Sequence, residues 1–102
     1  MFEEIREGEG LTVKIQSDLV ASGSKELKAR LVQLVEGGEK LLTLDFHEVK
    51  VIDSAGIGVL ISTQNSLKQG GQKLKLIGVR EPIFKMLKIM RLDKHFEISG
   101  VA

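Results

Sequence analysis

The sequence of 102 residues contains no cysteine, tryptophan or tyrosine, and it has a single proline. Without cysteine, disulfide bonds, thiolate metal sites and cysteine nucleophiles are excluded. Without Tyr and Trp, the usual aromatic platforms for stacking bases or sugars are missing. Histidine is scarce as well, and the two copies, His47 and His95, lie far apart in the sequence. We therefore expect no metal site and no cofactor.

The chain also has little net charge and no long apolar run. Fifteen basic and 14 acidic residues give a net charge of +1, which predicts no strong general attraction to nucleic acid or anionic membrane. No apolar run approaches the roughly 20 residues that a membrane span needs. The N-terminal residues 1–4 lack the basic and apolar regions of a signal peptide. We expect a cytoplasmic protein with no membrane span and no direct contact with nucleic acid.

Hydrophobic residues are plentiful by contrast. They make up 42% of the chain, which is too much for a disordered protein. The length suits one small domain and leaves no room for two. The sequence therefore predicts a single domain over residues 1–102 with a small core.

Apolar periodicity predicts alternating strands and helices along the chain. Residues 11–16 alternate strictly, which is typical of a strand with one apolar face. Residues 41–46 are apolar almost throughout, which is typical of a strand covered on both faces. The remaining strands are expected at residues 2–6, 73–77 and 95–98.

Three helices should separate these strands. Hydroxyls at Ser22 and Ser24 are candidates to cap the first, which Gly37-Gly38 should end. The second should occupy about residues 55–69, and the third should begin near Pro82. The first two strands should form an antiparallel hairpin, and the later strands should run parallel through right-handed crossovers. The fold class is therefore α/β, with a small mixed sheet of four to five strands and helices packed against it.

One segment, residues 51–60, combines apolar flanks with an Asp-Ser-Ala-Gly centre at a helix start. A helix N-terminus exposes backbone N–H groups, so a phosphate on Ser54 would be stabilised there while it adds about two negative charges beside Asp53. The simpler interpretation is ordinary helix capping by Asp53-Ser54, with glycines that allow close packing. A serine hydrolase is a further alternative, but the segment lacks the G-x-S-x-G elbow.

The whole chain resembles a STAS domain, and within that superfamily a bacterial anti-anti-sigma factor, also called an anti-sigma factor antagonist. The resemblance is carried by Leu44-Asp45-Phe46, by Asp53-Ser54-Ala55-Gly56-Ile57-Gly58-Val59-Leu60, and by Val79-Arg80-Glu81-Pro82-Ile83-Phe84-Lys85-Met86-Leu87. It implies the STAS fold, in agreement with the order of elements derived above.

The resemblance also implies a phosphorylation switch. In such proteins the serine after the motif aspartate, by position Ser54, is phosphorylated by an anti-sigma factor that is itself a serine kinase. The unphosphorylated form binds that kinase and frees a sigma factor, and a PP2C-type phosphatase restores it. The protein would then be a substrate and binding module without catalytic activity. The partner-binding residues expected by this resemblance are Asp53, Ser54, Ala55, Gly56, Ile57, Gly58, Val20 and Ser22.

The sequence departs from the family pattern at a few positions. Ser17 and Val20 stand where the family often has a glycine and an acidic residue, and Arg91-Leu92 stands where it often has Gly-Leu. A second functional hypothesis keeps the fold but makes the protein a STAS accessory subunit of a membrane transport system, for example in lipid trafficking.

The C-terminal half is basic. Residues 52–102 hold eight basic and four acidic side chains, and the basic ones run from Lys68 to Lys94. Without interleaved aromatic residues, a solvated helix face is the favoured interpretation over contact with an acidic partner or anionic lipid. Met86 and Met90 fall on the apolar stripe of the third helix and are expected in the core, whereas the sequence leaves Phe84 undecided.

Overall fold

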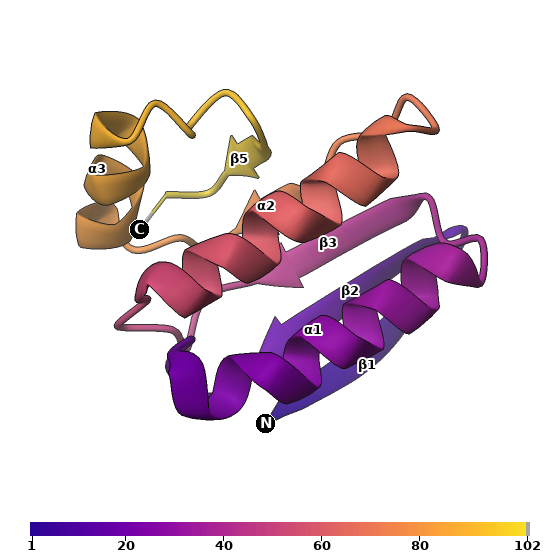
Figure 1. Ribbon diagram of the computed structural model, residues 1–102, viewed down its shortest axis with the longest axis horizontal. Helices are drawn as coiled ribbons and strands as arrows, with labels where there is room; N and C mark the ends of the chain where they lie inside the picture. Colours follow the sequence, from indigo (N-terminus) through magenta and orange to yellow (C-terminus); the bar gives the residue numbers. More distant parts are fainter. Residues whose placement is uncertain (102) are drawn as a thin grey trace.

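A five-stranded mixed sheet and three helices make up the computed structural model, which describes residues 1–101 (Figure 1). The order of elements is the one that the sequence predicts, and the sheet carries its strands in chain order from β1 to β5. The elements are β1 (Phe2–Glu7), β2 (Gly10–Ile15), α1 (Ala21–Glu36), β3 (Leu41–Asp45), α2 (Ser54–Lys68), β4 (Lys75–Ile77), α3 (Glu81–Ile89) and β5 (Glu97–Ser99).

The antiparallel pair β1–β2 confirms the predicted hairpin. Glu7 pairs with Gly10, so that only Gly8 and Glu9 form the loop. Gly8 has a φ of 62° at the first loop position, as a type II′ turn requires, and glycine adopts this conformation without steric cost.

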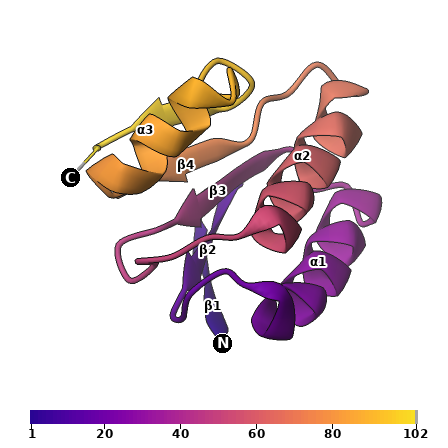
Figure 2. The ribbon, with the colours of Figure 1, turned by 60° about the vertical axis from the view of Figure 1, so that its left-hand side comes forward.

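The pairs β2–β3, β3–β4 and β4–β5 are parallel, as the crossover rule predicts. The helices α1 and α2 lie side by side on one face of the sheet, and α3 lies near the edge formed by β4 and β5 (Figures 1 and 2). Both α1 and α2 begin at the end of the sheet where β2 and β3 finish (Figure 1). This arrangement brings two helix N-termini to one place.

The helix layer covers only one face of β3, so the prediction of a strand covered on both faces is wrong. Leu42 and Leu44 point into the core, whereas Leu41 is 49% exposed and Thr43 and Asp45 are half-buried. The apolar residue Leu41 lies at the start of the strand, where it pairs only with Gly10 on β2 and has no partner on the short strand β4.

The third helix is shorter than its apolar stripe suggests. Met86 and Phe84 pack against the core, and Lys88 Nζ lies 6.0 Å from the centre of the Phe84 ring. Met90 is 47% exposed, so its assignment to the core is wrong. The physical reason is that α3 ends at Ile89, and Met90 caps it outside the packed turns.

The turn after α3 explains one departure from the family pattern. Arg91 has a φ of 59°, in the left-handed region that favours glycine. The N–H of Leu92 donates to the carbonyl of Leu87 at 2.8 Å, and the N–H of Arg91 donates to that of Lys88 at 3.0 Å. These two bonds form a Schellman motif with an arginine at its left-handed position. The turn is therefore kept, at the cost of backbone strain.

We expect Arg91→Gly to raise the free energy of unfolding by about 1 kcal/mol, because glycine removes the left-handed strain. Urea unfolding followed by far-UV circular dichroism measures this, since the chain offers no Trp fluorescence. Arg91→Ala is the matched control, because it removes the guanidinium and keeps the strain. Equal stability of the glycine and alanine variants would contradict the strain argument.

Candidate functional site

Ser54 is the first residue of α2, and its side chain is exposed. The residue that caps the helix is Asp53, whose backbone is extended and whose Oδ1 accepts a hydrogen bond from the N–H of Gly56 at 3.0 Å. The two neighbouring residues therefore have different roles. Asp53 satisfies the helix end, and the Ser54 hydroxyl lies at the surface beside it.

The same carboxylate also binds the start of α1. Oδ2 of Asp53 accepts a hydrogen bond from the N–H of Ala21 at 3.0 Å, across 32 residues of sequence. The expectation that Ser22 or Ser24 caps α1 is wrong, because the helix already begins at Ala21 and its N-cap Val20 supplies no side-chain acceptor. A distant aspartate therefore takes the place of a local cap.

A second aspartate, Asp18 in the loop before α1, binds the loop before α2. Oδ1 of Asp18 accepts hydrogen bonds from the N–H groups of Lys50 and Val51, at 3.0 and 3.1 Å. Between the two aspartates, the N–H of Leu19 donates to the Val51 carbonyl, and the N–H of Asp53 donates back to the Leu19 carbonyl. We call the paired segments 18–21 and 50–53 the clamp. It fixes the loop before α1 to the loop before α2.

Gly56 and Ile57 are buried, so they present little surface to a partner, and their place among the partner-binding residues stays a prediction. Ile57 is 5% exposed and belongs to the core. A Cβ on Gly56 would lie 2.3 Å from the Leu19 carbonyl oxygen and 2.7 Å from Cγ1 of Ile52. The missing side chain of Gly56 thus lets α2 approach the clamp.

The remaining predicted residues lie around Ser54, together with two that the sequence reasoning missed. Ala21 follows the N-cap of α1, and Val51 is 52% exposed within the clamp. A lone valine among polar residues gives no signal in the sequence, and only the clamp places it here. We call the following uncharged set the Ser54 patch: Val20, Ala21, Ser22, Val51, Ser54, Ala55 and Gly58.

Asp53 contributes a fixed negative charge at the edge of the Ser54 patch. The hydrogen bond from the Gly56 N–H is the largest cause that lowers the pKa of this carboxyl below its ordinary value. Desolvation opposes the shift, and the N–H groups of Ala21 and Ala55 add to it. Asp53 is therefore ionised at neutral pH, and a phosphate on Ser54 would stand directly beside it.

Neither histidine belongs to this site as a metal ligand. The ring of His47 binds Asp45, with Nδ1 and Oδ1 2.6 Å apart, and His95 lines a pocket at the opposite end of α2. Within residues 1–101, no group of three His, Asp or Glu side chains is placed to hold a metal ion.

In the same part of the chain, no helix has the length and apolar character needed to cross a membrane.

Comparison with known sequences identifies a family. A family model described as "Mlab, STAS domain" matches residues 3–100. The anti-sigma-B factor antagonist of Listeria monocytogenes is 29% identical over 98 residues, which are 94% of this chain and 84% of that protein.

Solved structures share the fold. An anti-sigma-factor antagonist (STAS) domain protein from Planctomyces limnophilus superposes with a TM-score of 0.86 at 13% identity, over 99% of this chain and 91% of that one. The unphosphorylated anti-sigma factor antagonist SpoIIAA of Bacillus gives a TM-score of 0.80 at 12% identity, over 100% and 90%. Its phosphorylated form gives 0.78 at 14% identity, over 98% and 92%. At these identities the likeness shows the fold alone.

We expect Gly56→Ala to lower the free energy of unfolding by about 1–3 kcal/mol, because the new methyl group collides with the backbone of the clamp. Gly58→Ala is the matched control on the same helix, since a Cβ there meets nothing within 4 Å. It should raise stability by about 0.5–1 kcal/mol through helix propensity. Urea unfolding of both variants measures this, and a similar effect at both sites would contradict the close approach at Gly56.

We expect Asp53→Asn to destabilise the protein more than Asp18→Asn. Asp53 uses both oxygens, so an amide there must lose one of its two partners. Asp18 accepts both of its hydrogen bonds through Oδ1, and the single oxygen of an amide side chain at that position can keep them. Because the pKa of Asp53 is lowered on folding, its contribution is full above the unfolded pKa of about 4 and is lost as pH falls through the folded value.

The difference in urea midpoint between wild type and Asp53→Asn should therefore be constant from pH 7 to 5 and shrink below pH 4. A difference that grows on acidification, or equal effects of the two amide variants, would contradict the role given to the second oxygen of Asp53.

Proposed function

The chain belongs to the STAS domain family, and from this premise we propose that it is an anti-sigma factor antagonist, switched by phosphorylation of Ser54. In this proposal the unphosphorylated protein acts as a single STAS domain in the cytoplasm. It binds an anti-sigma factor that is a serine kinase, and so frees a sigma factor. A PP2C-type phosphatase reverses the modification. The protein itself is a substrate and a binding module, and it catalyses no reaction.

One observation carries the proposal. The Ser54 hydroxyl is exposed at the first position of α2, while Asp53 alone does the capping. A kinase can therefore reach the hydroxyl without breaking the helix cap. A serine that served as the cap itself would be engaged with backbone N–H groups and less accessible.

The expected effect of the phosphate is electrostatic. The side chains of the Ser54 patch are uncharged by definition, and the ionised Asp53 and the exposed Asp18 and Lys50 of the clamp lie next to it. A phosphate introduces about two negative charges there, whose desolvation is costly and which repel the ionised Asp53 and any acidic group of the partner. The unfavourable charge appears at the centre of the contact, so the complex dissociates.

Val20 supports a simple form of this switch. The family often has an acidic residue at this position, whereas here a half-buried valine occupies the N-cap position of α1 and makes no side-chain hydrogen bond. The patch therefore lacks a second carboxylate, and phosphorylation changes it from uncharged to strongly negative.

The experiment mixes the protein with ATP and each candidate anti-sigma kinase of its host. Phosphate should map to Ser54, and Ser54→Ala should not be labelled. Labelling of another residue, or equal labelling of the alanine variant, would overturn the switch.

Binding of the unphosphorylated protein to the same kinase, measured by calorimetry, should weaken about tenfold or more in Ser54→Asp, since each 1.4 kcal/mol of charge penalty is tenfold. Ser66→Asp is the matched control, because Ser66 is an exposed serine near the other end of α2. It should leave the affinity unchanged. Equal weakening by both aspartates would point to net charge rather than to the patch.

The alternative function, a docking subunit of a transport system, predicts a different pattern. Its partner would be a transporter component, bound equally by the wild type and by Ser54→Ala without any kinase. For the hydrolase alternative, neither histidine forms a hydrogen bond with the Ser54 hydroxyl among the described residues, because Nδ1 of His47 binds Asp45 and His95 lines the pocket at the other end of α2.

A further inference from the structure

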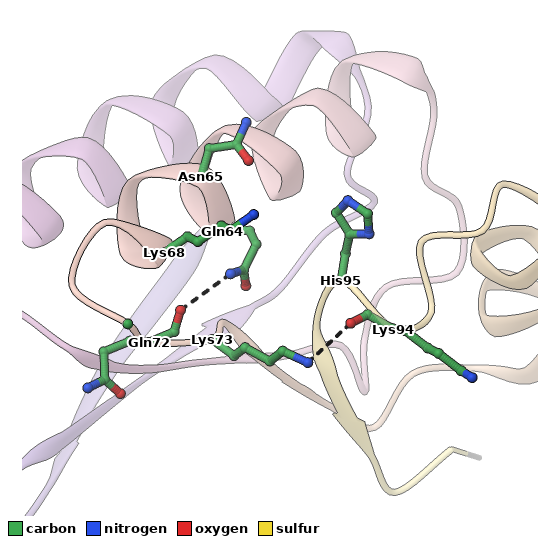
Figure 3. A pocket seen from close by; sticks show the side chains of 8 residues that line it. Gln64, Asn65, Lys68, Gln72, Lys73, Lys94 and His95 are labelled. Atoms are coloured by element: carbon green, nitrogen blue, oxygen red, sulfur yellow. Dashed lines mark hydrogen bonds between the residues drawn. The ribbon is translucent and has the colours of Figure 1, made fainter.

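A pocket of about 390 Å³ lies at the end of α2 opposite to Ser54 (Figure 3). Its walls come from the last turns of α2, the turn that follows, and the segment before β5. The lining residues are Gln64, Asn65, Lys68, Gly71, Gln72, Lys73, Lys94 and His95. A pocket of this size falls at the lower end of the range in which proteins bind small molecules.

Internal hydrogen bonds hold the walls in place. Gln64 is 5% exposed, and its Oε1 accepts from the N–H of Leu74 at 2.7 Å while its Nε2 donates to the Gln72 carbonyl at 3.3 Å. On the other wall, Nζ of Lys73 donates to the Lys94 carbonyl at 3.2 Å (Figure 3). These bonds tie the turn after α2 to the helix and to the segment before β5, so the pocket is preformed.

The lining carries three lysines and no carboxylate. In the part of the chain that the structure describes, none of Lys68, Lys73 and Lys94 forms an ion pair. Other lysines of the same basic stretch do, since Lys75 lies 3.9 Å from Glu97 and Lys85 lies 3.5 Å from Glu81. Arg80, Lys88 and Arg91 of the stretch form no ion pair within the described residues either. What distinguishes Lys68, Lys73 and Lys94 is that they line one pocket without a carboxylate.

The side chains that line the pocket differ in direction. Figure 3 shows the ends of Lys68, Asn65 and His95 around the opening, whereas the end of Lys94 extends away from it. The α2 C-terminus contributes a partial charge of about −0.5, which opposes an anion. The ammonium groups of Lys68 and Lys73 outweigh it, and the carbonyls of Leu67 and Lys68 are already bonded to N–H groups of the following turn.

We propose that this pocket binds a small, multiply charged anion of phosphate chemistry, such as a free phosphate or diphosphate or one carried by a small molecule. The lysines and the Asn65 amide offer hydrogen-bond donors at the rim, and no acidic group repels the ligand. The lining holds no Tyr, Trp or Phe, so recognition rests on the charged group rather than on a stacked ring. This site is separate from the Ser54 patch and does not depend on the proposed switch.

The probe is sodium pyrophosphate, titrated into the ¹⁵N-labelled full chain at constant ionic strength. Backbone amide shifts should move in a saturable way at residues 64–73 and 94–95 and leave residues 18–22 and 50–58 unchanged. Shifts that spread over all basic surfaces without saturation would overturn the proposal.

Lys68→Gln should weaken pyrophosphate binding about tenfold, since each 1.4 kcal/mol of lost interaction is tenfold. Lys28→Gln is the matched control, because Lys28 is exposed on α1 and lies outside the pocket. It makes the same change in net charge and should leave the dissociation constant unchanged. Equal weakening by both variants would mean general charge attraction and would overturn the site.

A further arm distinguishes the source of the phosphate. Vesicles of phosphatidylglycerol that sediment the wild type but not Lys68→Gln would assign the site to a lipid headgroup, and pyrophosphate binding without vesicle binding would assign it to a free anion. Ser54→Asp should bind pyrophosphate as tightly as wild type. Pyrophosphate affinity therefore tests the pocket independently of whether Ser54 is phosphorylated.

Discussion

The carboxylate of Asp53 is the interaction on which the rest of the molecule depends. It accepts one hydrogen bond from α2 and one from α1, and so satisfies the starts of two helices at once. The remainder of the clamp is built around it, and the close approach at Gly56 follows from it. Because both helices cover the same face of the sheet, this single group fixes how the helix layer meets the strand ends (Figure 1).

The clamp also determines what kind of switch the Ser54 patch can be. Its loops are held by backbone bonds and by Asp18, and α2 contacts the Leu19 backbone without an intervening side chain. Because the loops of the clamp are fixed in this way, we expect phosphorylation of Ser54 to change their conformation little. The added charge of a phosphate is then the main change that a partner would meet, and the apolar residues around it, Val20 and Val51, keep their places.

The sequence predicts the order of the elements, the hairpin and the position of Ser54 at the start of α2, because each of these rests on local periodicity and turn chemistry. Contacts between segments that are distant in the sequence could not be predicted in this way. Ser22 and Ser24 offered a local cap for α1, but the acceptor comes from Asp53, 32 residues away. The burial of Ile57 and the exposure of Val51 likewise depend on how the clamp orients its loops. The lysine pocket combines α2 with residues 94–95, which no spacing rule connects.

The strand order bears on how the chain folds. The strands lie in the sheet in the order in which they occur along the chain, so each new strand is added beside the one made just before it. No strand has to wait for a later one or insert between two that are already paired. Such a sheet can grow from the N-terminal hairpin outward while the chain leaves the ribosome, and each step closes only the single connection between consecutive strands. The three-residue strands β4 and β5 come last, when the longer part of the sheet already offers them an edge.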